Sequence, residues 1–196
     1  MVALFTKKQG RVSTAVSAAE KSKALPFLPR PANLDGSLAG DYGFDPLGIS
    51  NYIPVSYLRE SELKHGRTAM LAWIGYVAVD LGFRIYPLPA EWEGLTSATA
   101  HDAVVKQGGL TQIFIFTALL EMVSWIGIQQ MLQGSGREPG YFGFDPLGFS
   151  KGKSAAEVER LKLSEVIHSR AAMLGFSGIV TQSVLFNTGF PYDNHV

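Results

Sequence analysis

The sequence predicts an all-α membrane protein with three transmembrane helices, in which helices one and three cross and are related by pseudo-two-fold symmetry. Three observations predict this fold: three apolar stretches, an alternation of basic residues between them, and a pair of motifs that occurs twice. The apolar stretches are 68–83, 110–132 and 171–186. Only the second reaches the roughly 20 residues that cross a bilayer unaided. The other two become spans only if the charged residues before them also enter the membrane.

Composition agrees with a small membrane protein and excludes several functions. The 196 residues include 17 basic and 17 acidic ones, so the formal net charge is zero, and 46% are hydrophobic. A neutral chain lacks the basic surplus that nucleic-acid binding requires. The chain has no cysteine, which excludes disulfides, thiolate metal sites and cysteine nucleophiles. No grouping of nucleophile, base and oxyanion donors is visible, so we do not expect an enzyme.

The distribution of basic residues predicts the topology. Lysine and arginine number nine in 1–67, two in 84–109, five in 134–164 and none after 188. The positive-inside rule gives this alternation to a chain that crosses three times with its N-terminus on the positive side. A soluble helical protein does not predict it.

The elements follow from these stretches in order. Residues 1–35 are expected to form an extended N-terminal segment, because three prolines near its end break any helix. Spans are expected at about 56–84, 110–132 and 162–187. The second is the return crossing that lets the first and third run in the same direction. Residues 188–196 are left as a short tail on the far side.

Two motifs recur, one a turn and the other a charged helix start. The sequence Gly-Asp-Tyr-Gly-Phe-Asp-Pro-Leu-Gly at 40–48 returns as Gly-Tyr-Phe-Gly-Phe-Asp-Pro-Leu-Gly at 140–148. Each Asp-Pro indicates a tight turn. The sequence Glu-Leu-Lys-His-Gly-Arg-Thr-Ala-Met-Leu at 62–71 returns as Glu-Val-Ile-His-Ser-Arg-Ala-Ala-Met-Leu at 165–174.

The charges of the helix motif predict ion pairs between the two copies. An unpaired carboxylate or guanidinium near the centre of a bilayer costs several kcal/mol. The symmetry supplies the remedy, because each copy holds one glutamate and one arginine. We therefore expect Glu62 to pair with Arg170, and Glu165 with Arg67.

The histidines of the motif, His65 and His168, are not needed for neutrality. Each follows its glutamate by three residues and so lies on the same face of the helix. A neutral imidazole is a good metal ligand, and carboxylates suit a hard ion such as Mg²⁺. One donor per position along an apolar helix is the pattern expected for a pigment whose metal already has four ring nitrogens.

These motifs resemble the light-harvesting chlorophyll-binding protein family. The resemblance covers about 36–187 and includes both helix motifs and both Phe-Asp-Pro-Leu-Gly turns in order. It implies three transmembrane helices in the thylakoid membrane of a plastid, with 1–35 on the stromal and 188–196 on the lumenal side. It implies a protein that passes excitation energy to a photosystem I or II core, beside neighbouring antenna proteins and thylakoid lipids.

The resemblance also implies which residues bind chlorophyll magnesium. The stronger matches are Glu62, His65, Glu165, His168 and Gln182. Three further residues resemble ligands of the family less closely, and solvated or packed roles compete for each: Glu121, Gln129 and His195. Green-plant members usually have Asn at the position of His168, and either side chain can bind magnesium. His101 is expected in a polar loop without a specific role, and Asp80 is expected to cap the lower end of the first span.

The residues Glu-Leu-Lys-His-Gly-Arg of the first helix motif and the short C-terminus resemble those of the chlorophyll a/c antennae of red-lineage algae. Chlorophyll a, chlorophyll c and an oxygenated carotenoid, a xanthophyll, are then expected as cofactors. Two alternatives stay open. One is a photoprotective, energy-dissipating member of the same family. The other is a small ion or proton transporter that uses Glu62, Glu121 and Glu165.

Overall fold

The computed structural model describes residues 20–85 and 87–193, and all the named elements in these ranges are helices. The four α-helices are α1 (Val55–Asp80), α2 (Ser97–Lys106), α3 (Gly109–Leu132) and α4 (Ala155–Phe186). Two short 3-10 helices, Ile49–Asn51 and Ala90–Trp92, precede α1 and α2. The all-α prediction is therefore confirmed. The predicted ligand His195 and most of the predicted N-terminal segment lie outside the described residues.

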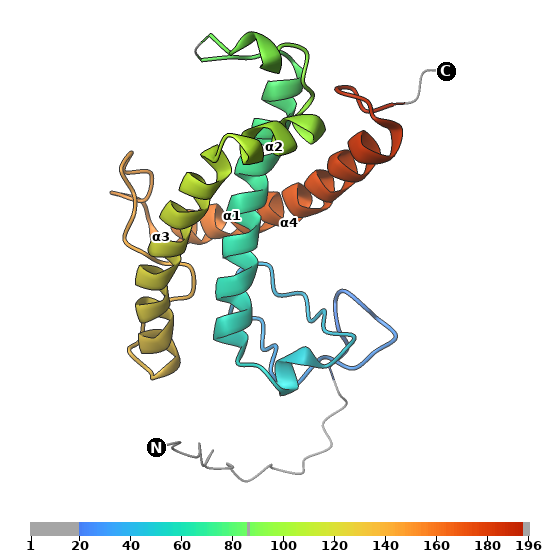
Figure 1. Cartoon of the computed structure of the whole chain (residues 1–196). Coiled ribbons are helices and arrows are strands. Elements are labelled where there is room, and N and C mark those ends of the chain that lie inside the picture. The colour runs from blue at the N-terminus through green and yellow to red at the C-terminus, as the bar shows by residue number, and fades with distance from the viewer. Residues whose placement is uncertain (1–19, 86, 194–196) are drawn as a thin grey trace, which may run out of the picture.

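Helices α1 and α4 form the centre of the molecule. Figure 1 shows α4 running obliquely behind α1, and the two helices make the most extensive contact between elements. They are in close contact where Gly66 faces Ser169, which is fully buried. A methyl group added at Gly66 would collide with the Ser169 side chain. These two residues occupy the same position of the repeated motif, so small side chains at that position permit the close approach.

Helix α3 stands to one side of this pair (Figure 1). Within the described residues it is the one helix whose length and composition alone suffice to cross a membrane. Large apolar side chains on it are widely exposed, including Phe114, Phe116, Val123 and Ile126. Such a surface is costly in water, so it points to lipid or another apolar partner around the helix.

Helix α2 was not predicted, and its presence corrects the placement of His101 in a loop. The helix starts at a capping box, in which the side chains of Thr96 and Thr99 each bond the other residue's backbone N–H. The usual sequence signal of such a box has Glu or Gln where Thr99 stands, and the helix is short and lies between two longer apolar stretches. His101 lies on α2 with Nδ1 3.1 Å from Asp102, and both side chains are exposed.

Asp80 serves the start of α2 rather than the end of α1. It is the last residue of α1, and its Oδ1 accepts a hydrogen bond of 2.6 Å from the backbone N–H of Ser97. The Ser97 hydroxyl in turn donates to the carbonyl of Tyr76, at 2.7 Å. A carboxylate is favourable at the positive end of a helix and unfavourable at the negative end. Asp80 was expected to cap the end of α1, and it instead caps the start of the neighbouring helix α2.

The boundaries of α1 and α4 differ from the expected spans. α1 ends at Asp80, before the predicted limit at 84. α4 begins at Ala155, before the predicted start at 162, because Ser154 and Glu157 form a second capping box. α4 is therefore 32 residues long, and its first two turns lie before the predicted span.

The two repeated turns have the same structure. The carboxylate oxygens of Asp45 accept the backbone N–H groups four and five residues later, at 2.9 Å each. Asp145 does the same at 2.9 and 3.0 Å. Both turns pass through a glycine with positive φ, 66° at Gly48 and 67° at Gly148, where a side chain would add strain. The aspartates thus stabilise two equivalent turns, one leading to α1 and the other to α4.

Candidate functional site

The first ion pair of the site joins α1 to α4. Arg170 Nε donates to Glu62 Oε1 at 2.6 Å, and Arg170 Nη1 donates to the carbonyl oxygen of Gly40 at 2.9 Å. Gly40 is the first residue of the first repeated turn, with φ of 72°. A single guanidinium from the second copy therefore holds both the carboxylate and the turn of the first copy.

The second ion pair repeats this arrangement with the copies exchanged. Arg67 Nε donates to Glu165 Oε1 at 2.7 Å, and Arg67 Nη1 donates to the carbonyl oxygen of Gly140 at 2.8 Å. These are the two pairs that the sequence leads us to expect. The additional bonds to the glycine carbonyls were not expected. They use the fork of donors that only arginine provides.

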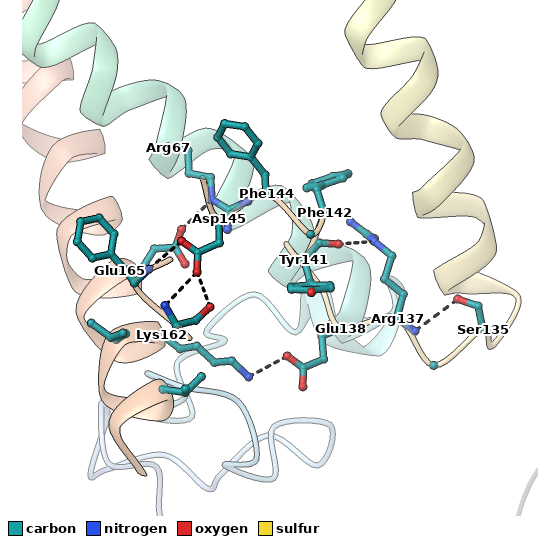
Figure 2. A pocket seen from close by; sticks show the side chains of 16 residues that line it. Arg67, Ser135, Arg137, Glu138, Tyr141, Phe142, Phe144, Asp145, Lys162 and Glu165 are labelled. Carbon is teal, nitrogen blue, oxygen red and sulfur yellow. Dashed lines mark hydrogen bonds and ion pairs between the residues drawn. The ribbon is translucent and has the colours of Figure 1, made fainter. Parts of the chain in front are cut away.

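Figure 2 shows that this second pair borders an open pocket between α1, α4 and the second repeated turn. The cavity has a volume of about 1360 Å³. Its wall is mixed in character: Phe142, Phe144 and Phe149 provide aromatic surface, and Arg67 and Glu165 provide charge. A cavity of this size has room for a large planar group with one polar anchor.

Both histidines are held in one orientation by the backbone. His65 Nδ1 lies 2.8 Å from the carbonyl oxygen of Ser61, and His168 Nδ1 lies 2.8 Å from that of Ser164. Because a carbonyl oxygen only accepts, Nδ1 carries the proton in each contact. The neutral ring then presents Nε2 as its acceptor, and both residues are exposed. This is how a metal-binding histidine is usually fixed by its second nitrogen.

The two glutamates differ in the contacts of the second carboxylate oxygen, Oε2, which the inter-helix arginine does not bind. Glu62 Oε2 lies 3.1 Å from Nη1 of Arg59, one helical turn earlier. Glu165 Oε2 has no partner among the described residues. The residue equivalent to Arg59 is Lys162, whose ammonium instead bonds Glu138 at 2.8 Å. Glu165 therefore offers a more open oxygen than Glu62.

The remaining predicted ligands lie apart from this centre. Gln182 is exposed on α4, and Gln129 is half-buried on α3. Glu121 on α3 is exposed and forms an ion pair with Lys64. Within the described ranges, no three His, Asp or Glu side chains converge as a conventional metal site. Each candidate thus stands alone as a donor, which suits a metal that brings its other ligands with it.

One buried charged contact was missed by the sequence analysis. Glu60 is 1% exposed, and its carboxylate accepts bonds from Arg137 Nη2 at 3.1 Å and from the Gly140 backbone N–H at 2.5 Å. Arg137 also lies 4.4 Å above the ring of Phe142. Glu60 precedes the repeated motif, and its equivalent in the second copy is Leu163, so the repeat carried no signal for it.

Comparison with known proteins identifies the family. Residues 30–184 match the family model described as "Chlorophyll A-B binding protein". This chain belongs to that family. It is 38% identical over 177 residues to chlorophyll a-b binding protein 1B-21 of Hordeum vulgare, covering 87% of this chain and 70% of the relative. It is 36% identical to chlorophyll a-b binding protein 6 of Arabidopsis thaliana, covering 87% and 71%.

A third relative names a photosystem. Photosystem I chlorophyll a/b-binding protein 5 of Arabidopsis thaliana is 34% identical over 199 residues, covering 91% of this chain and 76% of the relative. Membership of the family confirms the resemblance read from the motifs. These relatives are named for chlorophylls a and b, so they do not support the expected chlorophyll c, and the red-lineage assignment stays a prediction.

Proposed function

We propose that this chain is a light-harvesting antenna subunit that fixes chlorophylls at defined positions and passes their excitation energy to a photosystem. The observation that carries the proposal is the pair of equivalent groups of side chains on α1 and α4. Each copy has a carboxylate neutralised across the helix contact, and a histidine one turn later that presents Nε2 outward. The chain belongs to a family of chlorophyll-binding antenna proteins, not of enzymes, so its function is positional rather than catalytic.

The residues present fit a magnesium pigment. The outward Nε2 atoms of His65 and His168 and the open oxygen of Glu165 each offer one donor. Glu62 offers an oxygen that Arg59 also contacts, and Gln182 is exposed on the same helix as His168. When bound, chlorophyll absorbs light and exchanges excitation with its neighbours. The protein's part is to set distance and orientation, which the rigid helix pair does.

We further propose that α1, α3 and α4 each cross the thylakoid membrane, and that α2 lies at the lumenal surface. Three features support this: the alternation of basic residues, the apolar surface of α3, and the pairing of the motif glutamates with the motif arginines between α1 and α4. Neutralised pairs allow the charged turns of the two short apolar stretches to enter the bilayer. Carotenoids, as xanthophylls, are proposed for the grooves that small residues leave beside the helix contact.

The partner is proposed to be a photosystem core, and photosystem I is favoured because two relatives carry that name, one at 34% and one at 33% identity. The names of the relatives place them in the chloroplast. This chain is accordingly assigned to the chloroplast thylakoid membrane. Glu121 and Gln129 are retained as proposed ligands on α3.

The test is to purify the complex in mild detergent from thylakoids and to record its absorption, pigment content and fluorescence excitation spectrum. We expect several chlorophylls per chain and a carotenoid band that excites chlorophyll emission. A purified chain without chlorophyll would refute the antenna function and favour the transporter. A strongly shortened fluorescence lifetime at neutral pH would favour the energy-dissipating alternative.

A further inference from the structure

Lys64 departs from the symmetry that governs the other charges of the repeated motif. The motif glutamates and arginines pair across the two copies, at 2.6 and 2.7 Å. Lys64, between Glu62 and His65, has Ile167 as its equivalent in the second copy, so no symmetric partner exists for it. A charge added to one copy only must find its counter-charge elsewhere.

The partner of Lys64 lies on α3, which has no copy in the repeat. Lys64 Nζ is 2.6 Å from Glu121 Oε2 and 2.8 Å from the hydroxyl oxygen of Ser124. Ser124 lies one turn after Glu121 and 3.3 Å from the same carboxylate oxygen. Glu121 is the one charged residue in α3. The unpaired charge of the motif and the single charge of α3 therefore neutralise each other.

This contact completes a pattern among the carboxylates proposed as magnesium ligands. Glu62, Glu165 and Glu121 each have a cation at 2.6, 2.7 and 2.6 Å respectively, and that cation comes from another helix. Glu121 keeps Oε1 without a partner among the described residues, and its side chain is 61% exposed. The Lys64 side chain is only 23% exposed.

Charge balance explains why such a cation is needed. In chlorophyll the charge of Mg²⁺ is already balanced by the ring, so a carboxylate ligand leaves one net negative charge in an apolar surrounding. An uncompensated charge there costs several kcal/mol. A neutral ligand such as histidine or glutamine leaves no such charge and needs no counter-ion.

We infer that Lys64 is a positioning residue for a chlorophyll site on α3: it neutralises Glu121 and directs Oε1 toward the metal. The inference rests on the proposed antenna function. Lys64 itself touches no pigment in this scheme and acts only through the carboxylate. The interaction also joins α3 to the central helix pair, which it otherwise contacts sparsely (Figure 1).

The experiment uses the full chain, reconstituted with chlorophylls a and b and xanthophylls, and measures the concentration dependence and stoichiometry of chlorophyll binding. For Lys64→Met we expect the affinity of one site to fall about 10- to 100-fold, the usual effect of losing a residue that supports a metal ligand. Lys64→Arg should retain that site. Lys106→Met, at the far end of α2, is the matched control and should bind like the parent chain.

A double variant separates charge balance from helix attachment. Glu121→Gln leaves Lys64 without its counter-charge, so this single variant should also lose the site. Lys64→Met combined with Glu121→Gln removes both charges and keeps a neutral amide ligand, so it should recover the site. If the ion pair only attaches α3, the double variant will be as defective as Lys64→Met, and the inference is refuted.

The inference and the antenna function fail in different ways. If the parent chain takes up no chlorophyll, the antenna function itself is wrong. If the parent binds chlorophyll and Lys64→Met binds the same number with the same affinity, only the role of Lys64 is wrong. Reduced assembly of Lys64→Met does not obscure the result, because retention in Lys64→Arg and recovery in the double variant are each required.

Discussion

Replacing the two inter-helix arginines by leucine should destabilise the protein unequally, despite their matched geometry. Each replacement removes one charge-assisted hydrogen bond to a glutamate and one bond to a glycine carbonyl. These contribute about 1.5–3 and about 1 kcal/mol, so we expect each variant to lose roughly 3 kcal/mol. The carboxylates, however, are left in different states. After Arg170→Leu, Glu62 still has Arg59 at 3.1 Å.

After Arg67→Leu, Glu165 has no second cation, because the equivalent Lys162 bonds Glu138. We expect Arg67→Leu to cost about 1 kcal/mol more than Arg170→Leu, the value of one retained charged contact. For a chain of this length that difference lowers the melting temperature by a further 2–4 °C, approximately. Thermal unfolding of the reconstituted complexes, followed by helical circular dichroism, measures it.

Two controls define the result. Arg160→Leu, exposed on α4, should change the unfolding free energy by less than about 0.5 kcal/mol. Adding Arg59→Met to Arg170→Leu should remove the higher stability that Arg170→Leu has over Arg67→Leu. Equal melting temperatures for Arg67→Leu and Arg170→Leu, or a lower one for Arg170→Leu, would refute the reasoning.

Three further predictions concern the ligands, the turns and the helix contact. His65→Leu should lose one chlorophyll with the fold retained, whereas His168→Asn should keep its chlorophyll; pigment chromatography of both complexes checks this, and equal losses would contradict it. In the second turn, hydrogen bonds from the Ser150 hydroxyl and from backbone N–H groups lower the pKa of Asp145. The stability that these hydrogen bonds contribute is therefore fully present above the unfolded pKa of about 3.9 and is lost as pH falls through the lower pKa of the folded protein. Hydrogen exchange of the turn should accordingly become faster in acid, and Asp145→Asn should abolish this dependence on pH. Gly66→Ala should lower the melting temperature markedly, while Gly127→Ala, whose added methyl group meets only an ordinary contact at 3.8 Å, should not.

The repeat made the central contacts predictable from sequence. Glu62, Arg67, Glu165 and Arg170 are related by the repeat, and neutrality in an apolar setting left one sensible way to pair them. The structure places them in those pairs. Symmetry thus replaced the long-range information that a single sequence ordinarily lacks.

Contacts outside the symmetry were not predictable from sequence. Glu60 and Lys64 have Leu163 and Ile167 as equivalents, so their charges had no partner within the repeat. Their partners lie in a loop and on α3, at separations of 77 and 57 residues. Such contacts depend on how the elements pack, which local pattern does not reveal. The start of α4, by contrast, carries the sequence signature of a capping box, Ser154 followed by Glu157, which the sequence analysis did not use.

The asymmetric contacts act on a different part of the molecule from the symmetric ones. The symmetric pairs join α1 to α4 and hold both turns, so they fix the frame for the pigments proposed on these two helices. Glu60 and Lys64 both lie on α1 and reach toward α3 or the loop that follows it. A two-fold pair of helices has no symmetric place for a third helix. Charges without a repeat equivalent therefore help to hold α3 on one side, and with it any pigment that Glu121 binds.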